Sequence, residues 1–367
     1  MTTADDDARL AAAWAEVDDA LAAAHRAVVE DPDPRNARET ADGHRYLFHM
    51  MSAISQNAVL PADPDRPSFR PMIEATRHLG AAGKDIDYDV ALVRGGRPHR
   101  ITGHRGDATF VGVCVYDAGG AGGATALLAS VDLDDLELGP DGSFVLDLGG
   151  DDPGPGANWI PLPADAGSLI VRQYFHDRAA QRAGSWTIER RDGDVPAATL
   201  PTPASVTAHV HNVARQIRWN AGLNRLWGAE ERARPNRFVR QSAAEIVAAI
   251  PNPDVVYAMG WWRLADDEAL VVHHVPPAGC RWWSLQVLDR WFQCAPDRLA
   301  HRNDREVTPN ADGSVDLVLG AVDPGHPNWL DVGGHTVGTM FFRWLQAEPA
   351  ELPTCTVVPV ASLGVQD

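Results

Sequence analysis

The sequence predicts a mainly β protein with accessory helices, built from two related antiparallel β-sandwiches of jelly-roll type. The first observation is a texture of short alternating runs separated by Gly, Pro and Asp, at 109–116, 144–148 and 168–175. Alternation of this kind is typical of sandwich strands. The same texture returns after residue 251, and helical periodicity fills the first 60 residues and the stretch from about 205 to 249.

We therefore expect the chain order helix, sheet, helix, sheet. The predicted parts are a helical N-terminal segment (1–62), a first β-sandwich (63–200), a helical linker (201–249) and a second β-sandwich (250–367). In the N-terminal segment the residues at helical spacing are Leu10, Ala13, Trp14, Val17 and Leu21. In the linker, one buried helix face is predicted from the spacing of Val206, Val210, Val213 and Ile217. Arg215 lies on the opposite face and is expected to be exposed.

The two sheet regions share landmarks in the same order, which indicates duplication of a whole domain. The recurring pairs are Tyr88 and Tyr257, Asn158 and Asn328, Trp159 and Trp329, and Arg172 and Arg343. Residues that both copies keep are expected to serve the sandwich, whereas residues that one copy adds are candidates for function. Asp331 and His335 occur only in the second copy, where the first has Pro161 and Asp165.

Asp331, His335 and Arg343 are the predicted catalytic residues. The intervening Gly333-Gly334 predicts a loop that leads into a strand from His335 to Leu345. Period two places His335, Thr339 and Arg343 on one face of that strand, so we expect carboxylate, imidazole and guanidinium to converge. Asp331 would orient His335, His335 would move a proton, and Arg343 would hold a polar substrate group.

A polar row on the strand from Trp282 to Trp291 predicts the substrate cavity. Alternation separates Trp282, Ser284, Gln286 and Arg290 from an opposite face of Trp283, Leu285, Val287 and Trp291. The matching strand of the first copy lacks such a row. A row of this kind is either solvent-facing or lines a pocket, and we favour a pocket. The substrate-binding candidates are Tyr257, Trp282, Ser284, Gln286, Arg290, Asn328, Trp329 and Thr339.

Composition excludes several functional classes. Fifty acidic against 32 basic residues give a net charge of −18, which would repel nucleic acid and anionic membrane surfaces. No window approaches the roughly 18 consecutive apolar residues of a membrane span, and the N-terminus is acidic where a signal peptide is basic. We expect a cytoplasmic protein with a small-molecule substrate and neither nucleic acid nor membrane as partner; the oligomeric state stays open.

We expect no cofactor. G-x-G-x-x-G after a strand, a Walker loop and a G-x-S-x-G elbow are all missing from the sequence. Lys84 is the single lysine and lies in a glycine-flanked turn, which argues against Schiff-base chemistry. The four cysteines have no C-x-x-C spacing and predict buried free thiols.

Two minor alternatives remain open. If a metal is bound, its predicted ligands are His326, Asp331 and His335, two histidines and a carboxylate. Asp132, Asp134 and Asp135 match the D-x-D-D pattern of protonating carbocation cyclases, in which an aspartic acid of raised pKa donates the proton. Because the run precedes a Gly-Pro-Asp-Gly turn, we interpret it as a solvated acidic turn.

The motifs of the second sheet region resemble a known bacterial family. They are the stretch Arg281 to Trp291, the stretch Asp323 to His335 and the strand around Arg343. Together they resemble the domain-of-unknown-function 1214 family, most strongly over about 250–350. The resemblance implies jelly-roll sandwiches with accessory helices and implies no activity. Ser284 and Leu288 stand where the resemblance leads us to expect amides.

The functional hypothesis is a cofactor-independent acid–base enzyme, a hydrolase, lyase or isomerase, acting on a bulky and partly apolar molecule in a Trp-lined pocket of the second sandwich. The alternative is a non-catalytic sandwich that binds carbohydrate or lipid. In that case tryptophans would stack on the ligand, while Asp331 and His335 would only hydrogen-bond it.

Overall fold

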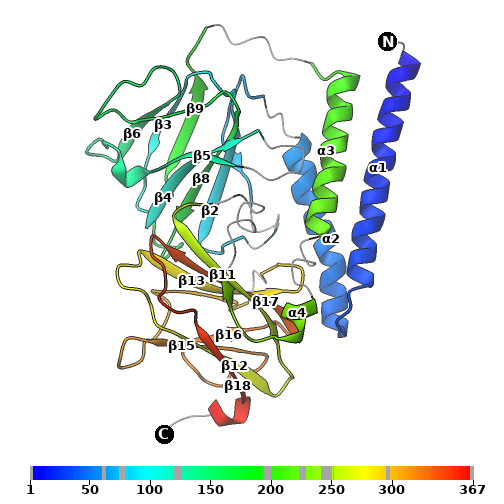
Figure 1. Ribbon diagram of the computed structural model, residues 1–367, viewed down its shortest axis with the longest axis vertical. Helices are drawn as coiled ribbons and strands as arrows, with labels where there is room; N and C mark the ends of the chain where they lie inside the picture. Colours follow the sequence, from blue (N-terminus) through cyan, green and yellow to red (C-terminus); the bar gives the residue numbers. More distant parts are fainter. Residues whose placement is uncertain are drawn as a thin grey trace.

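The computed structural model describes residues 3–59, 63–73, 80, 82–118, 126–193, 200–222, 229–240, 250, 252–294 and 298–363. Two sheet-rich halves are stacked on one another, and helices run beside the stack (Figure 1). These helices are α1 (Thr3–Val29), α2 (Ala37–Val59) and α3 (Pro203–Ala221). The predicted mainly β fold with accessory helices is confirmed.

Each half pairs a five-stranded with a four-stranded sheet. In the first half the larger sheet has the order β1 (Arg70–Pro71), β2 (Ile86–Leu92), β8 (Ala166–Tyr174), β4 (Phe110–Asp117), β5 (Leu127–Asp132). The smaller sheet has the order β7 (Trp159–Ile160), β6 (Ser143–Leu148), β3 (His99–His104), β9 (Ser185–Arg190). Its strand pairs are antiparallel except β6 with β7, and the short helix η1 (Leu133–Asp135) follows β5.

The second half repeats this topology. Its larger sheet has the order β10 (Val239–Arg240), β11 (Val255–Arg263), β17 (Val337–Leu345), β13 (Trp282–Asp289), β14 (His301–Asn303). The smaller sheet has the order β16 (Trp329–Asp331), β15 (Val315–Gly320), β12 (Glu268–His274), β18 (Thr354–Pro359), followed by η3 (Val360–Leu363). The strand orders of the two halves are identical once nine is subtracted from each strand number of the second half. The predicted duplication is therefore visible in the topology.

Two of the shared pairs, the asparagines and the tryptophans, have the same structural task in both copies. Asn158 bonds the backbone N–H and C=O of Glu137, and Asn328 does the same with Thr308. The indole N–H of Trp159 donates to the Gly149 carbonyl at 2.8 Å, and that of Trp329 to the Gly320 carbonyl at 3.1 Å. Each asparagine holds a loop through both backbone groups of one residue, which explains why both copies keep it.

The second core confirms the predicted alternation of two strands. It contains Trp283, Leu285 and Val287 of β13 together with Met340, Phe342 and Trp344 of β17. Phe342 and Trp344 stack with ring centroids 4.4 Å apart. Strand β17 packs tightly because it has Gly338, where an added Cβ would lie 2.2 Å from the Leu288 carbonyl oxygen and 2.8 Å from the Trp262 ring. The polar residues of both strands therefore point to the opposite face, toward the first half.

Helical packing follows small residues rather than the largest apolar ones. Helix α1 buries Ala13, Val17, Ala20, Ala24 and Val28, while Trp14, one of the residues noted at helical spacing, is 56% exposed. Helix α3 buries Val210, Ala214 and Ile217 and exposes Arg215, as predicted for Ile217 and Arg215. Val213 is half-buried and Val206 is exposed. Alanine allows helices to approach closely, so the buried stripe shifts toward it.

The second sandwich takes an edge strand from within the predicted linker. Helix α3 ends at Ala221, and the short helix α4 (Ala229–Ala233) follows. Strand β10 then pairs with β11, so the second sandwich begins before residue 250. The predicted helix over 241–249 lies outside the described residues.

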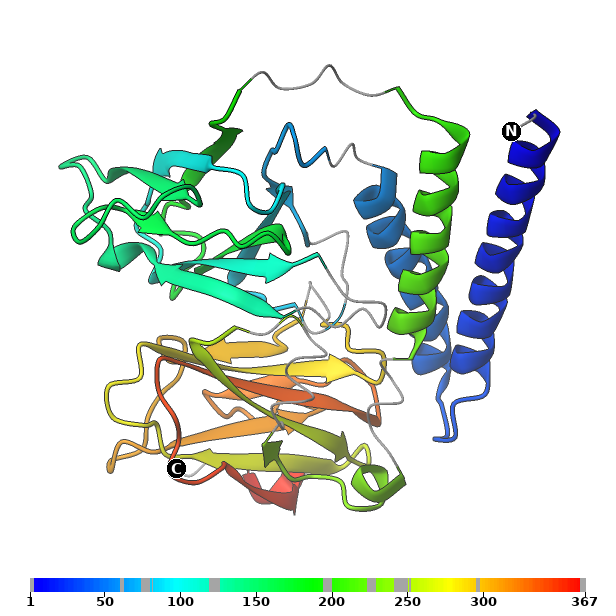
Figure 2. The ribbon, with the colours of Figure 1, turned by 45° about the horizontal axis from the view of Figure 1, so that its top comes forward.

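The two larger sheets face each other at the junction of the halves (Figure 2). A shared apolar cluster joins Ile86, Phe110 and Tyr174 of the first half to Val255, Trp282 and Leu345 of the second. Ion pairs from Arg281 to Asp132 and Asp134 also cross the junction. The D-x-D-D run is thus more than the solvated turn we expected, because two of its carboxylates tie the halves together.

Arg290 anchors the helices to the second half. Its side chain is fully buried and contacts Asp31 and Glu39, each at 3.0 Å, together with the carbonyls of Asp33 and Pro34. Strand β13 ends at Asp289, so Trp291 leaves the sheet and packs among the helices instead of joining the sandwich core. Gly43 of α2 permits this approach, since a Cβ added there would lie 2.6 Å from the Trp291 ring.

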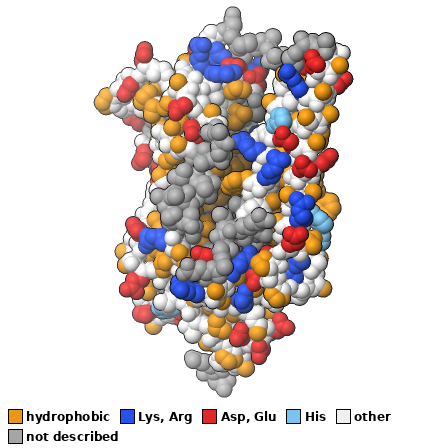
Figure 3. Space-filling model, turned by 45° about the vertical axis from the view of Figure 1, so that its right-hand side comes forward, with side chains coloured by type: hydrophobic (Ala, Val, Ile, Leu, Met, Phe, Trp, Pro, Cys, Tyr) orange, Lys and Arg blue, Asp and Glu red, His pale blue; other side chains and the backbone are white. Residues whose placement is uncertain are grey.

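The surface is mixed in charge. On the face in Figure 3, acidic and basic side chains are interspersed with hydrophobic ones, so the net charge of −18 is not gathered into one acidic field there. Among the described residues, no helix combines the length and apolar character needed to cross a membrane.

Candidate functional site

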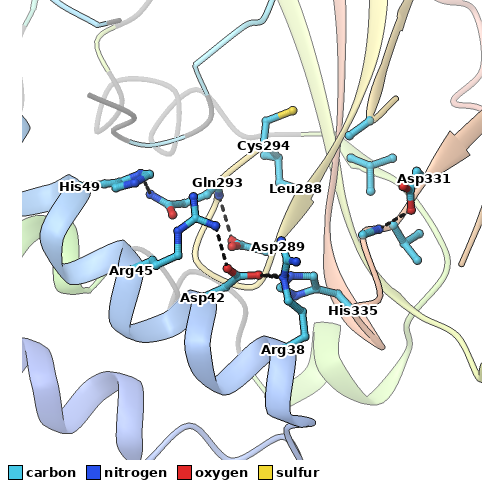
Figure 4. Close-up of a pocket in the computed structure, with 14 residues that line it drawn as sticks. Arg38, Asp42, Arg45, His49, Leu288, Asp289, Gln293, Cys294, Asp331 and His335 are labelled. Atoms are coloured by element: carbon cyan, nitrogen blue, oxygen red, sulfur yellow. Dashed lines mark hydrogen bonds and ion pairs between the residues drawn. The ribbon is translucent and has the colours of Figure 1, made fainter. Parts of the chain in front are cut away.

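A pocket of about 50 Å³ lies where α2 meets the second half (Figure 4). Apolar walls come from Val287, Leu288, Cys294 and Ala300. The polar lining consists of Arg38, Asp42, Arg45 and His49 from α2, with Asp289, Gln293, Asp331 and His335 from the second half. Two of the three predicted catalytic residues, Asp331 and His335, thus belong to one pocket.

Helix α2 supplies its polar wall through simple periodicity. Arg38, Asp42, Arg45 and His49 are spaced four, three and four apart, which places them on one helix face. None of these four residues was predicted from the sequence as part of a site. The signal that could have found them is this polar stripe, because charged side chains at helical spacing either face solvent or line a site.

His335 is held by Asp42, from the other side of the pocket. Its Nε2 lies 3.1 Å from Asp42 Oδ2, and the side chain is buried. A tight turn presents it, since Gly333 and Gly334 both have positive φ and the His335 N–H bonds the Val332 carbonyl. Among the described residues, His335 Nδ1 is buried and has no hydrogen-bond partner.

Asp331, predicted to orient His335, has other direct hydrogen-bond partners. Asp331 accepts hydrogen bonds from the Gly333 N–H at 2.7 Å and from Arg298 at 2.9 Å. No hydrogen bond joins Asp331 to His335, although the structure describes both residues. The glycine turn that separates them is stabilised by Asp331, so its carboxylate shapes the loop that carries His335.

Two carboxyl groups of the pocket have oppositely shifted pKa values. Burial acts to raise the pKa of Asp42, but hydrogen bonds and charge from Arg38 and His335 hold it below its ordinary value. Burial raises the pKa of Asp289 to about 6, against a lowering influence from His335. Figure 4 shows Asp42 bonded to His335 and Arg45, with Asp289 beside them. One carboxyl group stays ionised while the other titrates near neutrality.

Arg343 does not converge with His335, contrary to prediction. The two residues are eight apart along the chain, which corresponds to roughly 26 Å in extended structure at about 3.3 Å per residue. Two residues on the same face of a strand therefore need not belong to the same site. Arg343 is buried at the junction of the halves, where it donates to Gln286 Oε1 at 2.9 Å and lies over the Phe341 ring.

The predicted polar row likewise faces the junction rather than the pocket. Ser284 and Gln286 of this row are completely buried, as is the separately predicted Thr339. Gln286 donates to the Ala82 carbonyl at 2.8 Å, and the indole N–H of Trp282 donates to the Phe175 carbonyl at 3.1 Å. These two side chains find partners in the first half, which satisfies hydrogen bonds that burial would otherwise leave unmade. Tyr257, stacked on Phe341, belongs to the same layer.

The remaining substrate-binding candidates have structural partners. Arg290 is committed to the carboxylates of Asp31 and Glu39. Asn328 and Trp329 hold the loop and strand that their counterparts hold in the first copy. Among the described residues, no tryptophan lines this pocket, so it differs from the Trp-lined cavity expected from the sequence.

Neither minor alternative agrees with the geometry. His326, Asp331 and His335 are described residues, yet they do not form one of the clusters close enough to share a cation. In the D-x-D-D run, burial acts to raise the pKa of Asp134, but hydrogen bonds and charge from Arg105 and Arg281 keep it lowered. A cyclase acid needs the opposite shift. The four cysteines were predicted to be buried thiols outside any disulfide; none of them forms a disulfide, and two are buried and two half-buried.

Fold and site together define a two-domain β-sandwich protein with a helical layer and a polar pocket between layer and sandwich. Residues 83–177 match the family described as Protein of unknown function (DUF1214), which confirms the predicted resemblance. Residues 235–354 match Protein of unknown function (DUF1254). The motifs of the second sheet region that suggested the resemblance therefore lie within the DUF1254 match.

Solved structures share this architecture. A crystal structure of an uncharacterized protein from Burkholderia cenocepacia aligns with a TM-score of 0.88 and 29% identity, covering 97% of this chain and 99% of that one. A protein from Vibrio parahaemolyticus aligns with a TM-score of 0.51 and 13% identity, covering 86% and 98%. The second likeness concerns the fold alone. Among curated proteins, none matches this chain.

Proposed function

We propose that this protein is a cofactor-independent acid–base enzyme that transfers protons on a small molecule bound in the pocket between α2 and the second half. The observation that carries the proposal is the opposite shift of two carboxyl groups in one pocket, with the pKa of Asp42 lowered and that of Asp289 raised to about 6. Carboxyl groups whose environments separate their pKa values are a recurrent basis for acid–base assignments.

The contacts suggest a role for each group. Ionised Asp42 accepts a hydrogen bond from His335 Nε2, which leaves the lone pair of Nδ1 available as a general base. Asp289, with a pKa near 6, retains a proton in part of the molecules at neutral pH and can act as the acid. Isomerisation, elimination and hydrolysis all use such a pair.

The lining favours a small, anionic substrate. A volume of about 50 Å³ is far below the several hundred Å³ of pockets for bulky ligands. Arg38 and Arg45 stand at the pocket and both bond Asp42, so a carboxylate or carbonyl oxygen of the substrate would meet guanidinium donors there. We therefore propose a small oxo- or hydroxy-acid in place of the bulky, apolar molecule expected from the sequence.

The test is proton exchange into solvent deuterium. The protein is incubated in D₂O with a panel of small 2-oxo and 3-oxo acids, and loss of C–H signals is followed by ¹H NMR. We expect catalysed exchange with at least one acid, reduced on the order of 100-fold or more in His335→Gln. The matched control is His273→Gln, because His273 pairs with Asp316 on the surface, away from the pocket.

Full exchange activity in His335→Gln would refute the assignment of the base. Binding of an acid without any exchange would indicate the alternative, a binding protein in which Asp42 and His335 only hold the ligand. Failure of every acid both to bind and to exchange would contradict the proposed substrate class.

A further inference from the structure

A second cluster of potential ligands lies outside the pocket, at the junction of the two halves. Asp85, just before β2 of the first half, meets His301 of β14 and Glu306 of the second half. One ligand atom from each lies within 4.8 Å of the others. Since the halves are distinct domains, the cluster forms only when they are stacked.

The distances in this cluster are those of ligands around a cation. His301 Nδ1 lies 3.4 Å from Asp85 Oδ2 and 3.5 Å from Glu306 Oε2. These separations exceed those of a good N–H···O hydrogen bond. Two ligands about 2.1 Å from a tetrahedral zinc ion would be separated by about 3.4 Å. The two separations are therefore long for a hydrogen bond and match those of two ligands on one metal ion.

The surrounding groups orient the carboxylates, as the hydrogen-bond partners of metal ligands do. Asn303 Nδ2 donates to Asp85 Oδ2 at 2.6 Å, and the Asn303 N–H donates to Glu306 Oε2 at 3.0 Å. His301 is buried, with only 4% of its surface exposed.

We propose that Asp85, His301 and Glu306 bind one divalent transition-metal ion that joins the two halves. One imidazole nitrogen with two carboxylate oxygens suits Zn²⁺ or Mn²⁺ better than Mg²⁺, which takes mainly oxygen and water ligands. Glu306 has a side chain 41% exposed to solvent, which provides the metal with a route of entry. The site is independent of the proposed proton-transfer pocket.

The test is titration of tag-free, chelator-stripped full-length protein with Zn²⁺ by isothermal calorimetry, with Mg²⁺ as comparison. We expect one Zn²⁺ per chain, weakened on the order of 100-fold in His301→Gln and in Glu306→Gln, because loss of a group that merely orients a metal ligand already costs about 10–100-fold. Glu306→Gln guards against misfolding, since that side chain is partly exposed. Zn²⁺ should also raise the unfolding midpoint temperature of the wild type and of neither variant.

His273→Gln is the control, because His273 lies 2.7 Å from Asp316 in a comparable His–Asp pair that is not part of a three-ligand cluster of the described residues. It should bind Zn²⁺ as the wild type does. Absence of one-to-one binding in the wild type, or unchanged binding in His301→Gln or Glu306→Gln, would overturn the site and leave a plain ion-pair cluster.

Discussion

Replacing Arg290 by Ala tests how the helices are fixed to the second half. The guanidinium is fully buried and pairs with Asp31 and Glu39, whose side chains are 1% and 0% exposed. Removing one partner of a buried ion pair costs about 3–5 kcal/mol, because the remaining charge has no compensation. With two carboxylates left behind, we expect a loss in the free energy of unfolding toward the upper end of that range.

The effect should depend on pH in a defined direction. Burial acts to raise the pKa of Glu39, but hydrogen bonds from Asn36 and Thr336 and the charge of Arg290 lower it below 4.5. When the pKa of a carboxyl group is lower in the folded than in the unfolded state, its ionisation stabilises the fold. This contribution is present above the unfolded-state pKa near 4.5 and is lost as pH falls through the folded-state pKa. The penalty of Arg290→Ala should therefore be large at pH 7 and shrink as the pH falls below the unfolded value near 4.5.

Urea denaturation followed by tryptophan fluorescence measures both quantities. The control is Arg263→Ala, because Arg263 pairs with Asp33 near the same loop but is 45% exposed, and exposed pairs contribute about 0–1 kcal/mol. A loss below about 1 kcal/mol in Arg290→Ala, or a loss that does not change between neutral and acidic pH, would refute the reasoning.

Three further outcomes follow from the structure. Asp289→Asn should remove a pH-dependent loss of stability. Burial raises the pKa of Asp289 to about 6, so the protonated carboxyl stabilises the fold, and this contribution of about 1–3 kcal/mol is lost as pH rises from about 4 to 6. Urea melts over this pH range that do not differ between wild type and variant would contradict the prediction. Gly338→Ala should destabilise by more than about 2 kcal/mol in thermal unfolding, because its Cβ would meet the Leu288 carbonyl at 2.2 Å; a neutral result would disprove the close approach. Trp159→Phe and Trp329→Phe should each cost about 1 kcal/mol by the same assay, and a large inequality would show that the copies use these indoles differently.

Local patterns were enough to predict the sheets. Alternation in β13 and β17 correctly assigned Trp283, Leu285, Phe342 and Trp344 to the core, because side chains alternate in any strand regardless of what it packs against. The duplication was likewise readable, since the turns and the loop-holding Asn158 and Asn328 repeat in order.

The sequence alone did not decide which residues meet. Alternation along the strand placed His335 and Arg343 on one face. Their distance along that strand, however, puts His335 in the pocket and Arg343 at the junction of the halves. Asp42 reaches His335 from 293 positions away along the chain. That partnership depends on how α2 docks on the second half, which is set by the buried Arg290 network and the close approach of Trp291 to Gly43. Periodicity determines the face of an element, whereas packing between distant elements determines its neighbours.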